Sequence, residues 1–348
     1  MRTICILKAV GLLLPFIASA QLADTVSSEI KANQYIEKMD KYLTFRLSMN
    51  DDIQAFRVNS YIDYSIQPND KTLLKISTSY RWFSFSISAA PEFLPGNGDN
   101  DLKGESKATS FSLGLNFSHW IQGITYSRFK GYYLENTGDF DPGWIKDVDP
   151  YVQFPDFVYQ RFHGQTAYKF NEMFSFNALS VQTERQLRSA GTFMPVLSYE
   201  YYITDDQAEL TGQNKTQKEN NFELLLSLGY FHTFVIHRNF YASAGVMPGA
   251  GVIFGKLLTR QPGGNIESNQ SYFLLWAQGA GALGFNSERF FAGTQLIFSR
   301  GFYEEGASTT IRNDRFTYHL FLGYRFNAPK SLTKAADKAD EKRSKIFK

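Results

Sequence analysis

The sequence predicts an all-β protein, a closed antiparallel β-barrel that spans a membrane. Three observations lead to this fold: an export signal at the N-terminus, long runs of alternating apolar and polar residues, and no apolar run of 18 or more residues after the signal. Alternation with period two places successive side chains on opposite faces of a strand. A sheet in lipid must close on itself, because an open edge would leave backbone groups unpaired.

Residues 1–20 have the pattern of a cleavable signal peptide. Arg2 and Lys8 supply the positive start, an apolar stretch covers 9–17, and Ala18-Ser19-Ala20 provides small residues for cleavage. The apolar stretch is shorter than the ~20 residues that a lasting helical span needs. We therefore predict export across the inner membrane with cleavage after Ala20.

The composition of the mature chain excludes several classes of protein. The only cysteine, Cys5, lies in the signal, so neither a disulfide framework nor a thiolate metal site is expected. Without Arg2 and Lys8, the 36 basic residues fall to 34 and equal the 34 acidic residues, and a nucleic-acid binder would show a basic excess. Aromatic residues make up 16% of the chain and alternate with Ser, Thr, Asn and Gln, as in a sheet with one face in lipid.

Alternation of apolar and polar residues is clearest in the run 111–118, where Phe111, Leu113, Leu115 and Phe117 share one face. Such runs predict about fourteen strands, with twelve as the alternative. Most of these runs reach the ~9–11 residues that a membrane-spanning strand requires. The candidate strands lie near 42–49, 53–66, 71–81, 82–90, 108–118, 121–134, 156–169, 174–186, 192–203, 221–234, 239–256, 271–285, 288–301 and 313–327.

The connections fit a membrane barrel except at one place. Outer-membrane barrels have short periplasmic turns and long outer loops. Counting back from the last strand puts the polar connections 302–312, 257–270 and 204–220 outside. Two strands between 174 and 204 would then put the long connection 135–155 on the periplasmic side. One element in that stretch is therefore miscounted, or one long connection is periplasmic.

The two ends of the mature chain are polar. Residues 21–41 form a polar lead-in before the barrel, which we place at 42–327. The last strand ends on Phe326, which looks like the aromatic-ended signal of the outer-membrane insertion machinery. Residues 328–348 are rich in lysine and are predicted to be a helical or disordered periplasmic tail.

Several stretches resemble a Bacteroidota family known only as domain of unknown function 4421, whose members are expected to be outer-membrane β-barrels. The resemblance extends from about 42 to 327, and it implies a fold and a location without an activity. The matching residues are Ser79-Tyr80-Arg81-Trp82, Tyr126-Ser127-Arg128-Phe129-Lys130-Gly131-Tyr132-Tyr133, Gln182-Thr183-Glu184-Arg185-Gln186-Leu187-Arg188-Ser189-Ala190-Gly191-Thr192, Gly229-Tyr230-Phe231-His232-Thr233-Phe234-Val235, Met247-Pro248-Gly249 and Leu322-Gly323-Tyr324-Arg325-Phe326.

The segment from Thr183 to Gly191 is the most function-like feature of the sequence. Its polar residues can form a network in the lumen, or they can simply pair with each other and stabilise the barrel. Arg128 and Lys130 share one strand face and either join this network or lie at the outer rim, at the level of lipopolysaccharide. The candidate lumenal cluster comprises Arg128, Lys130, Thr183, Glu184, Arg185, Gln186, Arg188 and Ser189.

No catalytic, cofactor-binding or metal-ligating motif is recognisable. None of the five histidines has the spacing of a zinc site, and a Ser–His pair would have to join residues distant in sequence. The acidic residues of the 135–155 connection match no calcium loop and suit ordinary turn chemistry. We therefore expect neither a cofactor nor an enzyme, with an outer-membrane lipid-modifying enzyme as the least favoured option.

Two functions remain open from the sequence. Few charged residues alternate along the late strands, which favours a narrow or partly plugged channel over an open porin, with a connection such as 135–155 folded inward. The alternative is a closed anchoring barrel that binds protein or envelope partners through its loops and tails. Outer-membrane lipid and lipopolysaccharide are expected around the barrel, and the solute or protein partner is unassigned.

Overall fold

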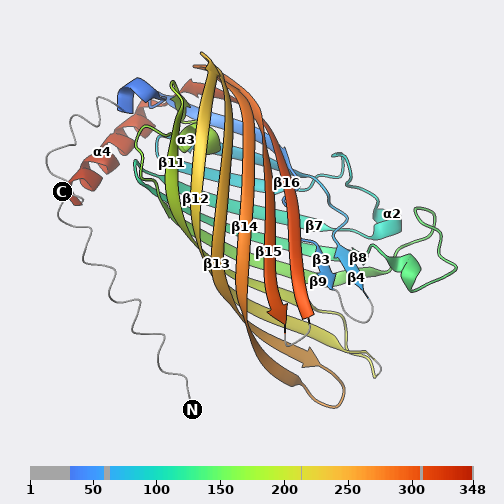
Figure 1. Cartoon of the computed structure of the whole chain (residues 1–348). Helices are drawn as coiled ribbons and strands as arrows, with labels where there is room; N and C mark the ends of the chain where they lie inside the picture. Colours follow the sequence, from blue (N-terminus) through green and yellow to red (C-terminus); the bar gives the residue numbers. More distant parts are fainter. Residues whose placement is uncertain (1–31, 59–62, 213, 306–308, 347–348) are drawn as a thin grey trace, which may run out of the picture.

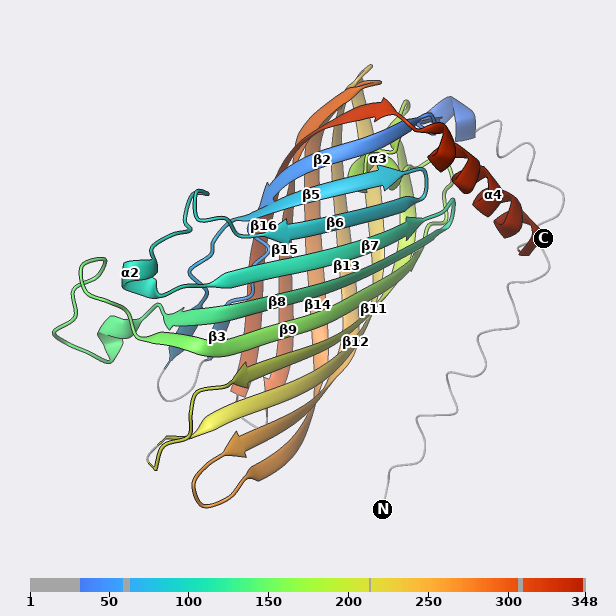
Figure 2. The same cartoon turned by 180° about the vertical axis from the view of Figure 1, so that it is seen from behind.

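The computed structural model describes residues 32–58, 63–212, 214–305 and 309–346. Within these ranges, twelve antiparallel strands form a closed barrel (Figure 1; Figure 2). Pairing of β8 with β9 and of β16 with β2 completes the ring. The barrel strands are β2 (Tyr42–Asn50), β5 (Leu73–Tyr80), β6 (Phe83–Ala89), β7 (Lys107–Asn116), β8 (Trp120–Leu134), β9 (Gln153–Tyr168), β11 (Ala190–Asp206), β12 (Thr216–His237), β13 (Phe240–Arg260), β14 (Ile266–Asn286), β15 (Phe290–Glu305) and β16 (Thr309–Asn327).

The alternative count of twelve strands is confirmed, and the count of fourteen includes two segments that are not barrel strands. Within 53–66, β3 (Phe56–Val58) and β4 (Tyr64–Gln67) form a hairpin that pairs only with the end of β8. Residues 174–186 contain the short helix α3 (Asn177–Ser180) and strand β10 (Glu184–Gln186), which pairs with β1 (Ile36–Lys38) in a separate sheet. Both segments alternate in polarity because one side of each packs against the barrel.

Removing the 174–186 strand also resolves the connection that did not fit. The short turns at 81–82, 117–119, 238–239 and 287–289 lie at one end of the barrel, which we call the turn end. The connection 169–189 is longer and lies at the same end. The opposite loop end carries 51–72, 90–106, 135–152, 207–215 and 261–265. Connection 135–152, with the 3₁₀ turn η2 (Thr137–Asp139), extends away from the barrel instead of folding inward as expected (Figure 1).

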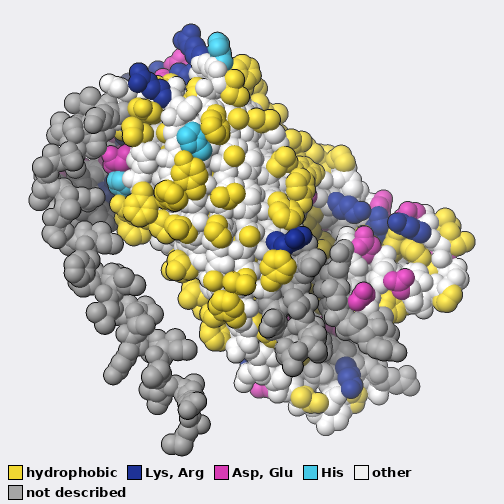
Figure 3. All heavy atoms as spheres, in the orientation of Figure 1, with side chains coloured by type: hydrophobic (Ala, Val, Ile, Leu, Met, Phe, Trp, Pro, Cys, Tyr) yellow, Lys and Arg dark blue, Asp and Glu magenta, His cyan; other side chains and the backbone are white. Residues whose placement is uncertain are grey.

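The outward face of the barrel is apolar. Large hydrophobic side chains are exposed at alternate positions along the strands, and the space-filling view shows them spread over the wall of long strands (Figure 3). Charged side chains in this view lie mostly near the two ends of the barrel. The exposed set includes Ile76, Phe85, Leu113, Ile124, Phe162, Leu197, Leu226, Val246, Phe273, Leu283, Leu296 and Leu320. Within the described ranges, no helix is both long and apolar enough to cross a bilayer.

The C-terminal tail is a helix, one of the two states expected for it. Helix α4 (Lys330–Ile346) lies along the turn end, beside the ends of β5, β6 and β7 (Figure 2). Arg81 in the β5–β6 turn holds it through Asp337 at 2.7 Å and Asp340 at 2.9 Å. Its position is therefore fixed by ion pairs to the barrel.

The loop end is held by a network of asparagines. Asn97 Oδ1 accepts the backbone N–H groups of Lys71 at 2.8 Å and Thr72 at 3.0 Å, next to the one-turn helix α2 (Asn100–Lys103). Asp70 is buried in this network, and its Oδ2 has no hydrogen-bond partner. Burial, with a smaller effect of Glu92, raises the pKa of the Asp70 carboxyl to about 7.

We predict that the loop end loosens as the pH rises from about 4 to about 7. An unfolded aspartate ionises near pH 4, whereas the buried Asp70 keeps its proton to about pH 7, so this group lowers stability progressively over that interval. Limited proteolysis within 91–106 should be faster at pH 8 than at pH 5. Asp70→Asn should abolish this difference and the exposed Asp101→Asn should leave it; equal rates in the unmodified protein would contradict the prediction.

A second prediction concerns close packing inside the barrel. A Cβ at Gly323 would lie 2.1 Å from Cζ of the fully buried Phe291 and 2.4 Å from the carbonyl oxygen of Phe45. Gly323→Ala should therefore cost about 1–3 kcal/mol of stability. When samples are heated stepwise before electrophoresis in detergent, the compact band of the folded barrel should disappear at a lower temperature than in the unmodified protein.

The matched control is Gly279→Ala, in β14, where an added Cβ meets nothing within 4 Å. This variant should melt like the unmodified barrel. Equal melting of the two variants would show that the contact at Gly323 is not tight.

Candidate functional site: a plug inside the barrel

Residues 169–189 form a plug, which fills the lumen at the turn end. The segment follows β9, turns through α3 and β10 and returns to the wall at β11; α3 lies within the barrel outline in Figure 1. A barrel of eight strands is just filled by its own side chains, and a wider one has space to fill. The plug occupies part of that space in this twelve-strand barrel.

Apolar packing seats one side of the plug. Phe174 is fully buried, and Phe176 packs against a cluster of lumen-facing residues on β8, β9 and β11. That cluster comprises Ile121, Ala167, Met194 and Val196. The two phenylalanines are two positions apart, which is the spacing of side chains on one face of a strand. Here the same spacing occurs in an irregular segment that packs on the barrel wall.

Polar side chains of the opposite wall hold the backbone of the plug. Arg46 Nη1 on β2 donates to the carbonyl oxygen of Ser180 at 2.6 Å and to Gln182 Oε1 at 3.2 Å. Gln295 Nε2 on β15 donates to the carbonyl oxygen of Leu179 at 2.7 Å. The carbonyls that follow α3 are therefore satisfied by the barrel wall, as buried carbonyls must be.

Arg325, near the end of β16, uses all three of its guanidinium nitrogens to hold the plug and the neighbouring turn. Its side chain is completely buried, and Nε and Nη2 donate to the carbonyl oxygen of Gln182 at 2.9 and 2.6 Å. Nη2 also donates to Asn286 Oδ1 at 2.6 Å, and Nη1 donates to the carbonyl oxygens of Ser287 and Glu288. One guanidinium thus joins the last strand, the β14–β15 turn and the plug, and the planar five-donor fork of arginine suits this arrangement.

The N-terminal strand β1 holds the plug from its other side. Ile36, Glu37 and Lys38 pair with Gln186, Arg185 and Glu184 of β10. Gln186 is buried, and its side-chain amide donates to the carbonyl oxygens of Tyr35, Met173 and Arg188. Residues 35–38 of the polar lead-in are therefore part of the plug assembly.

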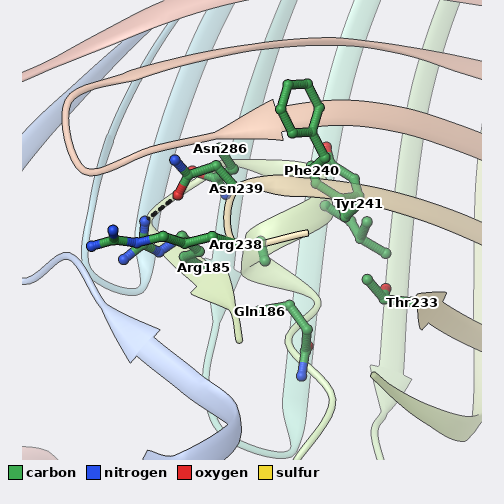
Figure 4. A pocket seen from close by; sticks show the side chains of 10 residues that line it. Arg185, Gln186, Thr233, Arg238, Asn239, Phe240, Tyr241 and Asn286 are labelled. Carbon is green, nitrogen blue, oxygen red and sulfur yellow. Dashed lines mark hydrogen bonds between the residues drawn. The ribbon is translucent and has the colours of Figure 1, made fainter. Parts of the chain in front are cut away.

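Arg185 seals the junction between the plug and the wall. It pairs with Glu37 of β1, and its Nη1 donates to Asn239 Oδ1 at 2.7 Å, in the β12–β13 turn (Figure 4). The cavity that remains between Arg185, Asn239 and Tyr241 has a volume of only about 10 Å³. This is near the lower limit for one water molecule.

The structure gathers six of the eight candidate cluster residues and separates the other two. Thr183, Glu184, Arg185, Gln186, Arg188 and Ser189 all lie in the plug, where Ser189 Oγ accepts the N–H of Val235 at 3.0 Å. Arg128 and Lys130 lie instead on the outward face of β8, which they share with the exposed Ile124. Lys130 pairs there with Asp156 at 3.0 Å, near the loop end.

The lumen beyond the plug contains a charged group that sequence reasoning missed. Arg161 and His163 on β9 both contact Glu200 Oε2 on β11, at 2.7 and 3.1 Å. Glu200 pairs in register with Glu223 on β12. Glu223 has no hydrogen-bond or ion-pair partner among the described residues. A sequence signal was present, because Glu223 stands between two apolar residues, Phe222 and Leu224, in an alternating run.

A second segment closes the lumen at the loop end. Asp52 pairs with Arg315 on β16, whereas the Phe56 ring packs 5.4 Å from Tyr159 and 5.7 Å from Phe157 on β9. In the ring of strands, β16 and β9 are six positions apart in either direction, so they face each other across the barrel. Residues 51–56 therefore cross the lumen, and we call them the crossing segment.

Among the described residues, no group of three or more His, Asp or Glu side chains is arranged to hold a metal ion. The charged groups of the lumen instead form contacts between neighbouring strands, such as those of Arg161 and His163 with Glu200. The chemistry that this arrangement supports is selection and binding of charged groups.

We predict that Arg325→Met loosens the plug. Methionine keeps the length of the side chain but removes all the donors, and a hydrogen bond from a charged group contributes about 1.5–3 kcal/mol. Trypsin cleavage after Arg185 in the folded barrel should accelerate roughly ten- to hundredfold, measured by mass spectrometry.

The control for this experiment is Arg300→Met on the outward face of β15 near the loop end. It should leave cleavage after Arg185 unchanged. Unchanged cleavage in Arg325→Met, with the compact gel band retained, would show that Arg325 does not hold the plug.

The structure is similar to several bacterial outer-membrane proteins at low sequence identity. For the outer membrane protease OmpT from Escherichia coli, the identity is 6% and the TM-score 0.33, over 84% of this chain and 98% of that one. For the β domain of the Bordetella autotransporter BrkA, these values are 12% and 0.37, over 82% and 100%. For the ferric yersiniabactin uptake receptor FyuA from Yersinia pestis, they are 11% and 0.31, over 82% and 44%.

At these identities and scores, the likenesses say nothing about substrate or activity. No curated protein matches the chain. A family model described as a domain of unknown function (DUF4421) matches residues 23–326. The match includes β1, the twelve barrel strands and the plug, and the chain belongs to this family.

Proposed function

We propose that the protein is a narrow outer-membrane channel that is closed by its own plug, for a solute that is not yet assigned. The observation that carries this proposal is the double closure of the lumen. The plug fills the turn end, and the crossing segment fills the loop end. A barrel whose only role is structural has no need of two separate closures around a charged interior.

The outward face supports a location in the outer membrane. Aromatic rings form contacts around the turn end, including Trp120 with Tyr168 at 5.2 Å and Phe240 with Phe285 at 5.0 Å. Such girdles mark the level of the membrane interface, with an apolar band between them. The turn end then faces the periplasm and the loop end faces outward, as short turns and long loops do in such barrels.

The interior supports a conducting path. Lys75, Glu223 and His319 occupy lumen-facing strand positions and have no hydrogen-bond or ion-pair partner among the described residues. Burying a charge without a partner costs several kcal/mol, so these groups favour a hydrated lumen between the two closures. A hydrated, charged lumen is typical of channels.

Removal of both closures is the direct test. We expect the purified full chain to be silent in planar bilayers, or to open only briefly. A variant in which Gly-Ser linkers replace both 172–187 of the plug and 51–56 of the crossing segment should give stable single-channel steps, because both closures of the lumen are then lost. The control is the same type of replacement at 141–147 in the outer loop, which should remain as silent as the full chain.

Silence of the variant without the two closures, with the compact gel band retained, would overturn the channel proposal.

The alternative, an anchoring barrel with docking sites at its ends, is favoured by helix α4. Arg81 and Trp82 hold Asp340 in place, and α4 exposes Lys334, Lys338 and Lys342 away from the barrel. A rigid basic helix of this kind offers a surface to an acidic partner in the periplasm.

A further inference from the structure

The plug has a cavity on the side that faces the β7–β8 turn. Its volume is about 270 Å³, and its walls come from β1, the plug and the turn at 117–119. Apolar walls are provided by Ile36, Phe117 and Phe176. The cavity is distinct from the sealed junction at Arg185, on the opposite side of β10, which has room for about one water molecule.

Charges of both signs line this cavity without pairing with each other. Lys169 is buried, and its Nζ donates only to the carbonyl oxygen of Phe174, at 2.5 Å. Glu184 accepts a hydrogen bond from Ser175 Oγ, and Lys38 is exposed at the rim. Among the described residues, none of these three charges has an ion-pair partner. Desolvation by burial lowers the pKa of Lys169, and the nearby carboxylates of Glu184 and Glu172 offset only part of this effect.

A buried amide in the cavity wall also lacks a partner. Asn177 is 7% exposed and lines the cavity, and its Oδ1 has no hydrogen-bond partner. A buried polar atom that is left unpaired costs about 1–3 kcal/mol. A ligand that donates an N–H group would satisfy this oxygen, and a ligand anion would satisfy Lys169.

We propose that this cavity is a binding site for a small zwitterionic solute of the amino-acid or short-peptide type. Lys169 and Lys38 bind its carboxylate, and Glu184 with Asn177 Oδ1 binds its ammonium group. The apolar walls at Phe117 and Phe176 accept its side chains. A site with an unpaired cation, an unpaired anion and an unpaired acceptor matches a ligand that carries both charges and N–H donors.

This inference deepens the proposed function, on which it rests for its meaning, because it names the class of solute and places it on the plug. The site includes β1, α3 and β10 together. A bound solute therefore contacts β1, which holds the plug, together with α3 and β10 of the plug itself. Bound solute is then positioned to change how firmly the plug is seated.

Calorimetric titration of the full chain in detergent tests the binding site. Three probes are used: the dipeptide alanyl-leucine, its N-acetylated amide without either charge, and inorganic phosphate. We expect saturable binding of the dipeptide only. Lys169→Met and Glu184→Gln should each weaken it by roughly tenfold or more, since each removes a charge-assisted contact. The control Lys107→Gln, at the loop end, should leave it unchanged.

The titration tests the binding site independently of the bilayer recording, which tests the channel. Binding of phosphate as tight as that of the dipeptide would show that the cavity is a simple anion site. Binding of the uncharged analogue would show that it is an apolar pocket. Either result would overturn the proposal. No binding of the dipeptide by a chain with a compact gel band also overturns it, while the bilayer result stands on its own. Because Lys169→Met could disturb the plug, trypsin cleavage after Arg185 is measured in parallel, and Glu184→Gln keeps the Ser175 hydrogen bond available.

Discussion

A ring of twelve strands encloses more space than its inward side chains fill, and this constraint determines the rest of the interior. The two longest connections between barrel strands, 51–72 and 169–189, supply the two stretches that enter this space, the crossing segment and the plug. Each uses rings to cover the apolar part of the wall and polar groups to satisfy buried backbone. Phe56 does this on β9 and Phe176 on β8, β9 and β11. The lumen is therefore closed by chain that belongs to the same molecule.

The end of β16 joins closure of the barrel to seating of the plug. Phe326 points outward into the aromatic contacts of the turn end, whereas its neighbour Arg325 points inward to the carbonyl of Gln182. Gln182 has a φ of 53°, an uncommon conformation for a residue with a side chain. Because Arg325 lies on the last strand, the plug can dock fully only when this strand has paired with β2. Barrel closure and plug seating are coupled for this physical reason.

The interior has a graded character from one end to the other. The loop end is apolar around Tyr132 and Tyr159, the middle carries Arg161 and Glu200, and the turn end holds the plug with its cavity. In the channel that we propose, a solute that enters from the turn end meets Lys169 and Glu184 of the cavity before it meets the charged middle. In that proposal the plug is both the barrier and the first surface that such a solute contacts.

The sequence by itself determined the barrel, because alternation with period two is a local property of each strand and requires no knowledge of its partners. It also singled out the segment from Thr183 to Gly191 as the most function-like feature, because polar and charged residues cluster there. The tertiary structure alone decided which alternating runs are strands. Residues 174–186 alternate like a strand, but Phe174 and Phe176 are buried against the lumen wall while β10 pairs with β1. The same holds for Arg128 and Lys130, whose side of the sheet depends on the register of β8 with β7 and β9. It also holds for Arg325 and Gln182, which lie 143 residues apart in the sequence and meet only in the folded barrel.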